Sequence, residues 1–235
     1  MSLFQFRYFS IEQANLGLKI GTDAMLLGAV VDAEFKKNGL DLGTGSGVLS
    51  LMQAQKNEAI QIDALEIDPK AVEIAQLNFQ NSSWNNRLNC IEKDYLVYDT
   101  DKTYDLIFTN PPFHLEQVYS PTVNKKLARS SDEGHLIGII NQVAQLLTSD
   151  GDFWIIAPHT LEEKLVNWAE QKELFPNNVI QIEGKIKQIK RVILNFKRQK
   201  NSIKRKVFVV RNDDNSYTEE YKNLTQDFHH PDFKL

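Results

Sequence analysis

Short apolar runs of strand length alternate with longer segments of helical length through most of the chain. Several of the longer segments carry helix-start signals, such as Pro69 at a first turn and Asp132 as a cap. A helix between successive strands supplies the crossover that parallel strands require. The pattern therefore predicts an α/β fold whose mainly parallel sheet is covered by helices on both faces. The predicted strands are 39–42, 60–66, 88–91, 104–109 and 153–157, and the predicted helices are 69–79, 132–147, 161–172 and one that opens at 48.

Both ends of the chain depart from this alternation. Residues 179–182, 192–196 and 207–210 are predicted strands without convincing helices between them, which indicates an antiparallel edge. Residues 4–8 alternate like a short strand, and Thr22-Asp23 can cap a helix. We divide the single predicted domain (1–235) into an N-terminal lid segment (1–30), a core (38–172) and basic C-terminal strands (176–211).

Composition excludes several classes of protein. Hydrophobic residues make up 42% and charged residues 25% of the chain, and no apolar run approaches the length of a membrane span. The first ten residues lack the regions of a secretory signal, and Cys90 has no second cysteine with which to form a disulfide. We therefore expect a cytoplasmic protein that does not interact with membranes. His229 and His230 are adjacent, so their side chains diverge, and we expect no metal site.

The charges are strongly segregated along the chain. The net charge is −4, yet residues 185–211 hold eleven of the 27 basic residues and none of the 31 acidic ones. Such a segment is typical of a phosphate-binding surface, and Lys197, Arg198 and Lys200 are candidates for contacting RNA. The alternative is a solubilising surface on exposed strands, where lysine is common.

A glycine-rich turn follows the first strand of the core. It runs from Asp41 through Gly43, Gly45 and Gly47, at the edge of a parallel sheet where ligands bind. Val48 stands where a dinucleotide-binding motif has its third glycine, which weakens an NAD assignment. Glu66 ends the next strand 23 residues after Gly43, the spacing expected of a carboxylate that accepts ribose hydroxyls. The combination favours an adenosine ligand over a ligand-free turn or an ordinary surface carboxylate.

This stretch resembles the cofactor site of class I S-adenosylmethionine-dependent methyltransferases. The resemblance implies a Rossmann-like, seven-stranded sheet, with the three glycines lining the cofactor and Asp41 near its amino-acid end. It also implies that Glu66 holds the ribose and that Asp94, in Glu-Lys-Asp94-Tyr95, contacts the adenine amino group. The alternative for Asp94 is a loop carboxylate that caps a turn.

The tetrapeptide Asn110-Pro111-Pro112-Phe113 follows the fourth strand directly. The amine of a nucleobase is a poor nucleophile because its lone pair is delocalised into the ring. The side-chain oxygen of Asn110 and the carbonyl of Pro111 can each accept one N–H, which turns the lone pair toward a methyl donor. The prolines hold these acceptors rigidly, and Phe113 offers a face for stacking an extruded base. The alternative is a proline-rich strand exit with Phe113 in the core, although the motif is that of amino methyltransferases.

The whole chain is similar to the bacterial tRNA (adenine-N6)-methyltransferases that modify adenine 37 of a valine tRNA. The likeness includes Phe4–Phe9, Lys19–Gly28, Ala128-Arg129 and the tail 217–228. It departs at Phe113, where tyrosine is usual, and at Tyr8, where a polar residue is usual. These departures leave the RNA target open.

By this resemblance S-adenosylmethionine is the cofactor, and an unpaired adenine in a tRNA anticodon loop is the substrate. Lys19, Thr22 and Asp23 would then close the cofactor pocket, and Arg129 would meet a phosphate. From the residues alone, Thr22 and Asp23 are equally well explained as helix caps, and Arg129 as a solvated charge. No obligate protein partner is implied.

Two classes of function compete with this hypothesis. An amino methyltransferase could act on another RNA or DNA base or on a protein glutamine. A non-enzymatic RNA-binding or chaperone protein could keep the fold and the basic segment, although an intact Asn110 argues against it.

Overall fold

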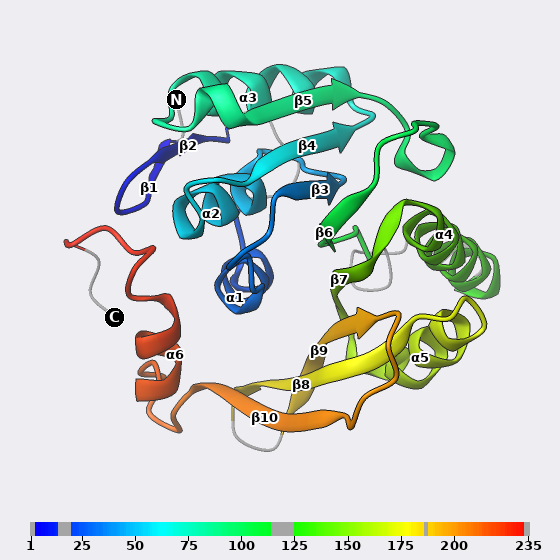
Figure 1. Ribbon diagram of the computed structural model, residues 1–235. Helices are drawn as coiled ribbons and strands as arrows, with labels where there is room; N and C mark the ends of the chain where they lie inside the picture. Colours follow the sequence, from blue (N-terminus) through cyan, green and yellow to red (C-terminus); the bar gives the residue numbers. More distant parts are fainter. Residues whose placement is uncertain (1–2, 14–19, 114–124, 186–187, 233–235) are drawn as a thin grey trace.

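The computed structural model describes residues 3–13, 20–113, 125–185 and 188–232. For residues 125–132 it describes the backbone alone. Its main feature is an eight-stranded sheet in the order β10-β8-β9-β7-β6-β3-β4-β5 (Figure 1). A two-stranded antiparallel hairpin, β1 (Leu3–Gln5) with β2 (Ser10–Glu12), lies beside the sheet. The sheet strands are β3 (Asn38–Leu42), β4 (Gln61–Glu66), β5 (Leu88–Glu92), β6 (Tyr104–Thr109), β7 (Leu147–Pro158), β8 (Phe175–Lys185), β9 (Ile189–Lys197) and β10 (Lys204–Arg211).

Seven of these eight strands run parallel, which confirms the α/β fold with a mainly parallel sheet. Two details of the prediction were wrong. The sheet has eight strands rather than seven, and its edge strand β10 pairs parallel with β8. The antiparallel strand is β9, which lies inside the sheet between β7 and β8. Apolar alternation predicts that a segment is a strand, but it does not specify the neighbour with which that strand pairs.

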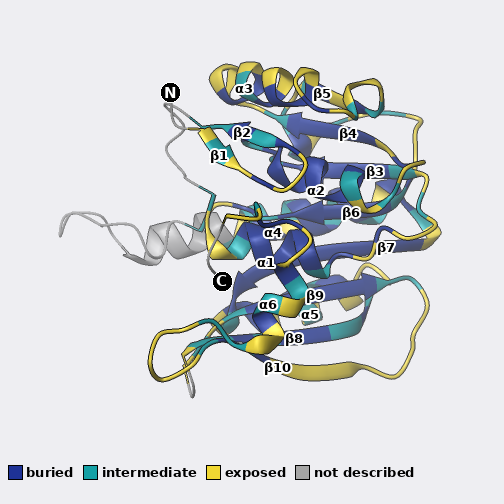
Figure 2. Ribbon diagram, turned by 90° about the vertical axis from the view of Figure 1, so that its left-hand side faces the viewer, coloured by how far each residue is buried: buried dark blue, intermediate teal, exposed yellow. Residues whose placement is uncertain are grey.

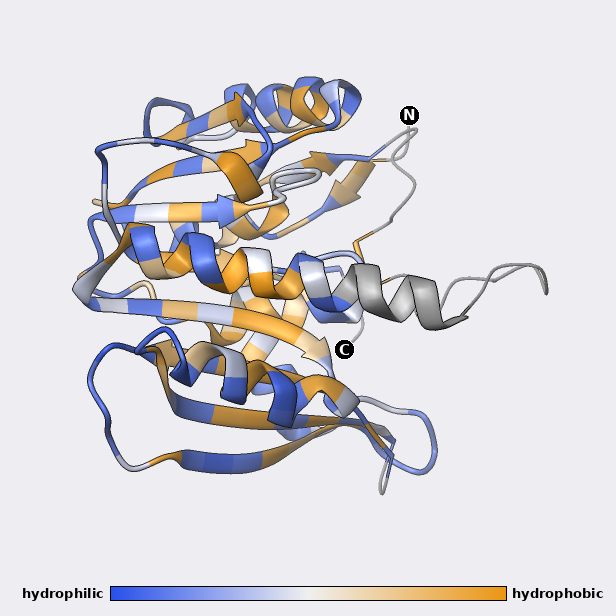
Figure 3. Ribbon diagram, turned by 90° about the vertical axis from the view of Figure 1, so that its right-hand side faces the viewer, coloured by the Kyte–Doolittle hydropathy of each residue, from blue (hydrophilic) through white to orange (hydrophobic). Residues whose placement is uncertain are grey.

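Helices cover both faces of the sheet because successive residues of a strand point to opposite sides. In β6, Leu106 and Phe108 belong to one buried cluster and Ile107 to the other. The first cluster includes residues of α1, α2, α3 and α6, and the second includes residues of α4 and α5, the helices in front of the sheet in Figure 3. Figure 2 shows buried central strands and an exposed β10. The helices are α1 (Thr22–Val30), α2 (Val48–Lys56), α3 (Pro69–Gln80), α4 (Lys125–Leu146), α5 (Glu162–Glu170) and α6 (Glu219–Thr225).

Local signals explain where some of these elements begin. Asp68 caps α3, accepting a hydrogen bond from the backbone N–H of Lys70, and Pro69 occupies the first turn as predicted. α1 differs, because its N-cap residue is Gly21 and no side chain caps it. The interpretation of Thr22 and Asp23 as caps was therefore wrong. The prediction that Asp132 opens a helix was also wrong, since α4 already begins at Lys125.

The N-terminal segment is a hairpin rather than one alternating strand. Phe4 lies in β1, whereas Tyr8 lies in the connection to β2 and is exposed. Phe6 bridges to His229 near the carboxyl end, and its ring stacks on Phe9 at 4.3 Å between centroids. The hairpin is thus held by aromatic packing and by the tail of the chain.

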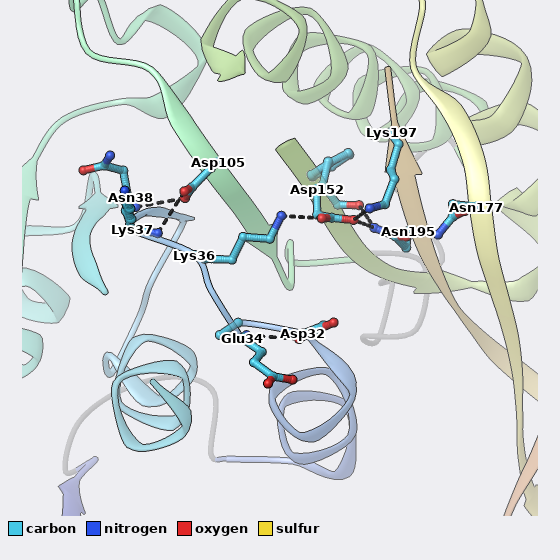
Figure 4. Close-up of polar contacts among 12 residues, drawn as sticks. Asp32, Glu34, Lys36, Lys37, Asn38, Asp105, Asp152, Asn177, Asn195 and Lys197 are labelled. Atoms are coloured by element: carbon cyan, nitrogen blue, oxygen red, sulfur yellow. Dashed lines mark hydrogen bonds and ion pairs between the residues drawn. The ribbon is translucent and has the colours of Figure 1, made fainter. Parts of the chain in front are cut away.

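A polar network joins the sheet at the edge where the parallel strands begin, here called the amino edge (Figure 4). The buried carboxylate of Asp152 pairs with Lys36, with Lys197 at 3.1 Å and with the Asn195 amide at 3.0 Å. Asn195 accepts hydrogen bonds from Asn177 and Asn178, both at 3.0 Å. The network ties the segment before β3 to β7, β8 and β9.

Replacing Asp152 with alanine should lower the free energy of unfolding by about 2–4 kcal/mol, because it leaves the ammonium group of Lys36 largely buried and unpaired. Urea unfolding would measure this loss. Asp150→Ala is the matched control, since Asp150 is exposed and two positions away. Equal losses in the two variants would contradict a stabilising network.

Candidate active site

Three strands bring the predicted site residues to one edge of the sheet. β3 lies between β4 and β6, and Leu42 is paired in register with Leu65 on one side and Thr109 on the other. The hydroxyl of Thr109 donates to the carbonyl of Leu42 at 2.7 Å, which fastens the ends of β3 and β6 together. The glycine turn, Glu66 and Asn110 therefore leave the sheet side by side, at what we call the carboxyl edge.

The three glycines of the turn serve different purposes. All three have positive φ, between 57° and 83°, a region that side chains disfavour. A Cβ on Gly47 would lie 2.5 Å from the ring of Phe79, and one on Gly43 would lie 3.2 Å from the ring of Tyr95. A Cβ on Gly45 would meet no atom within 4 Å. Gly43 and Gly47 thus permit close packing, whereas Gly45 borders open space.

Asp41 is fully buried beneath this turn. Its Oδ2 accepts hydrogen bonds from the hydroxyls of Thr44 and Ser50, both at 2.7 Å, while its Oδ1 has no partner among the described residues. Burial raises the pKa of Asp41 from 3.8 to about 6, although both hydroxyls act in the opposite direction. Sequence reasoning found Asp41 but missed Thr44 and Ser50, since a hydroxyl within a glycine turn and one in the next helix are common.

Glu66 is half-buried and is bound to the backbone of the site. Its Oε2 accepts from the N–H of Gly45 at 2.9 Å, and its Oε1 accepts from the N–H groups of Ile67 and Asp68 at 2.8 and 3.1 Å. A carboxylate has about four acceptor positions, two on each oxygen, so Oε2 can still accept one hydrogen bond from a ligand. Ile67, which sequence reasoning missed, is 60% exposed and presents an apolar surface directly beside this carboxylate.

Asp94 and Tyr95 lie at the end of β5. Asp94 accepts from the N–H of Leu96 at 2.8 Å and so caps a short 3-10 helix, the alternative that its sequence left open. Tyr95 packs on Gly43, and its hydroxyl lies 2.6 Å from Nε2 of His135 on α4. Burial raises the pKa of Tyr95, which keeps its phenol neutral. Neither Tyr95 nor His135 was foreseen, because only the fold brings α4 over this turn.

The proline tetrapeptide follows β6 at the carboxyl edge. Asn110 is half-buried, Pro111 is buried and Pro112 is exposed. Phe113 is half-buried and packs against the cluster under α4 and α5. The structure therefore brings the predicted acceptor residues to the same edge as the glycine turn.

Other predicted site residues lie elsewhere or beyond the described parts. Lys19 falls outside the described residues, and Arg129 falls where only the backbone is described. Thr22 is exposed at the start of α1. Asp23 pairs with Arg191 at 2.8 Å, which links α1 to the end of β9 at the carboxyl edge.

The basic residues Lys197, Arg198 and Lys200 are not brought to the site. Lys197 pairs with Asp152 in the amino-edge network, and Arg198 donates to the carbonyls of Ala144 and Leu147. Lys200 lies over the ring of Phe175, 5.6 Å from its centroid. Because β9 is antiparallel to its neighbours, its carboxyl end lies at the edge opposite Asn110. The position of these residues in the sequence did not reveal this.

The described residues contain no group of three or more His, Cys, Asp or Glu side chains arranged to hold a metal ion. No helix within the described ranges is long and apolar enough to cross a membrane.

Comparison with known proteins gives consistent matches. Residues 15–185 match the family model of the methyltransferase small domain. The chain is 38% identical to the tRNA1(Val) (adenine(37)-N6)-methyltransferase of Flavobacterium psychrophilum, over 97% of this chain and 99% of that protein. It is 36% identical to the protein of the same name from Actinobacillus pleuropneumoniae, over 96% of each.

Solved structures share the fold. A predicted O-methyltransferase from Agrobacterium tumefaciens superposes with a TM-score of 0.67 at 15% identity, covering 89% of this chain and 98% of that one. A methyltransferase from Pyrococcus furiosus superposes with a TM-score of 0.61 at 17% identity, covering 80% of this chain and 88% of the other. At these identities the likeness concerns the fold alone.

The buried Asp41 makes stability depend on pH in a defined direction. Because folding raises its pKa to about 6, its contribution to stability is full below about pH 4 and is lost as pH rises through 6. The free energy of unfolding of Asp41→Asn, relative to the wild type, should therefore rise between pH 4 and 7 by up to about 3 kcal/mol. Urea unfolding at the two pH values would measure it.

Asp63→Asn is the control of opposite sign. Burial acts to raise the pKa of Asp63, but hydrogen bonds from Lys102, Tyr104 and Asn89 together hold it below its usual value. Its contribution is nearly complete above about pH 4 and is lost as pH falls below that value, so the relative stability of Asp63→Asn should stay nearly constant from pH 4 to 7 and rise as pH falls below 4. Parallel trends in the two variants would contradict the assignment for Asp41.

Proposed function

The chain belongs to the methyltransferase small-domain family, and we propose that it catalyses the reaction in the name of its relatives, the tRNA1(Val) (adenine(37)-N6)-methyltransferases. It transfers a methyl group from S-adenosylmethionine to N6 of adenine 37 in a valine tRNA. The observation that carries the proposal is the position of Asn110-Pro111-Pro112-Phe113. This tetrapeptide leaves β6 at the same edge as the glycine turn and Glu66, where β3 and β6 are fastened by Thr109.

The residues of the glycine turn fit this cofactor. The buried Oδ1 of Asp41, which has no partner in the described part of the chain, is suited to a cationic donor, such as an amino group, because an uncompensated buried charge is costly. The open space beside Gly45 leaves room for a ligand, and Oε2 of Glu66 retains an acceptor position for a ribose hydroxyl. Asp94 is assigned to the adenine amino group. When bound, S-adenosylmethionine supplies a methyl group activated by a sulfonium.

Asn110 and Pro111 prepare the amine of the substrate. The amide oxygen of Asn110 and the carbonyl oxygen of Pro111 each accept one N–H of the adenine amine, which favours a pyramidal nitrogen with its lone pair directed at the methyl group. Pro111 and Pro112 restrict the backbone, so these acceptors are preorganised. Phe113 stacks against the extruded base, and its partial burial fixes the ring. The methylated ammonium is acidic, so its proton leaves without a strong base.

Asn110→Ala should lower kcat by on the order of 100-fold or more, because Asn110 acts mainly in the transition state, and should leave the Kd for S-adenosylmethionine within about twofold. Transfer of a tritiated methyl group to valine tRNA, with nucleoside mapping of the product, measures the rate and identifies the base. Asn177→Ala, an asparagine at the amino edge, is the control variant. A valine tRNA with guanine at position 37 is the control substrate. Unchanged turnover in Asn110→Ala would refute its role, and methylation of the guanine control would refute the adenine assignment.

Part of the basic segment lies at the carboxyl edge, which supports a role for it in binding the RNA. Lys190 and Arg191 lie at the start of the antiparallel strand β9, and Lys185 ends β8, so all three lie at the carboxyl edge. Lys185 and Lys190 are exposed. Lys197 lies six positions after Arg191 in β9, a distance of about 20 Å along the strand. We therefore assign phosphate contacts to Lys185 and Lys190 rather than to the lysines at the amino edge.

Replacing Lys185 and Lys190 with Glu should weaken tRNA binding and reduce the magnitude of the slope of log K against log salt concentration by about 1–2. The slope changes because binding releases fewer counterions when the protein neutralises fewer phosphates. Lys200→Glu with Lys204→Glu is the matched control, since both lysines are exposed at the amino edge and the change in charge is identical. Filter binding over a salt series measures both slopes. An equal or larger effect of the control pair would contradict this assignment and would indicate that the phosphate contacts lie at the amino edge.

A further inference from the structure

α3 presents two neighbouring side chains to the glycine turn. The ring of Phe79 packs on Gly47, as described above, and the preceding residue, Asn78, is only 2% exposed. The Asn78 amide donates to the carbonyl of Ser46 at 2.8 Å and to the carbonyl of Glu12 at 3.0 Å. Its oxygen accepts from the N–H of Glu12 at 2.8 Å. One buried carboxamide thus joins the end of the N-terminal hairpin to the middle of the glycine turn.

The bond to Ser46 acts where the backbone has the most freedom. Ser46 lies between Gly45 and Gly47, whose φ values of +57° and +83° belong to a region that only glycine adopts readily. Glycine loses more backbone entropy than other residues when its conformation is fixed, so ordering a turn with glycine on both sides of Ser46 is costly. Holding the Ser46 carbonyl restricts this turn before any ligand arrives, and a preorganised site binds more tightly than one that must order on binding.

The bonds to Glu12 require the hairpin to be in place. Asn78 pairs with both backbone groups of Glu12, the last residue of β2, as a neighbouring strand would. The hairpin itself is fixed by the stacked rings of Phe6 and Phe9, with Phe9 against Trp84 at 5.7 Å. Docking of the hairpin therefore helps to fix the position of the Asn78 side chain, and this side chain in turn holds the backbone of the glycine turn.

We infer that Asn78 is a positioning residue that couples docking of the N-terminal hairpin to cofactor affinity by fixing the backbone of the glycine turn. The inference rests on the proposed function only in assigning S-adenosylmethionine to this turn. Asparagine suits the role because the amide both accepts and donates, whereas a carboxylate could serve the Glu12 N–H but neither carbonyl.

The experiment compares Asn78→Ala with Asn195→Ala. Asn195 is also a buried asparagine that bridges separate elements, but it lies in the amino-edge network. Both variants should lower Tm, because each removes a buried amide that makes at least three hydrogen bonds. Only Asn78→Ala should raise the Kd for S-adenosylmethionine, measured by calorimetry, by tenfold or more. Its kcat at saturating cofactor should stay within about threefold of the wild type, since the amine-binding residues are unchanged. Asn78→Ser, which keeps a small polar group, replaces the alanine variant if that variant does not fold.

Hydrogen exchange without cofactor separates this inference from the proposed function. Asn78→Ala should speed exchange of the amides at 44–48 and 3–12, whereas Asn195→Ala should not. Faster exchange there, together with no binding of S-adenosylmethionine by the wild type, would support the positioning role and reject the proposed cofactor. Exchange in the turn equal to that of the wild type, or a Kd within twofold of it, would overturn the role of Asn78. Equal increases in Kd for the two variants would also overturn it, because they would reflect general destabilisation.

Discussion

The site depends on the register of β3 between β4 and β6. Because Leu42 is opposite both Leu65 and Thr109, the segments that follow β3, β4 and β6 leave the sheet at the same level. A shift of one residue in either pairing would turn Thr109 or Glu66 to the other face and separate the turn from the proline tetrapeptide. The Thr109 hydroxyl, bound to the Leu42 carbonyl, strengthens one of these pairings at the last residue pair of the ladder. The chemistry proposed for Asn110 therefore depends on a constraint set in the sheet.

The sequence predicted those features that short-range chemistry decides. Gly43, Gly45 and Gly47 were recognisable because a strand followed by a glycine turn and a helix is a local pattern, and all three have positive φ. The apolar runs gave the strands of the core for the same reason. The insertion of β9 between β7 and β8, and the pairing of β10 with β8, depend on contacts between distant segments. Period-two alternation carries no information about them.

The same limit applies to the candidate site. Tyr95, His135 and Asn78 lie in ordinary loop or helix sequences, and only the fold brings them to the turn. For the basic segment the sequence was misleading in the other direction: residues close in sequence were expected to form one surface, but the fold separates them. The direction of β9 sends Lys190 and Lys197 to opposite edges of the sheet, where Lys197 pairs with Asp152. A run of charge along a strand therefore cannot be assigned to one surface until the ends of that strand are known.

The distribution of charge within the site agrees with transfer of a methyl group to a neutral amine. The carboxylates Asp41 and Glu66 lie at the glycine turn, where they favour a ligand that carries positive charge. The acceptors assigned to the amine are the neutral oxygens of Asn110 and Pro111. Each of these oxygens can accept an N–H of the amine without placing a further negative charge on the substrate side. In the proposed reaction the carboxylates therefore lie on the cofactor side and neutral dipoles on the substrate side.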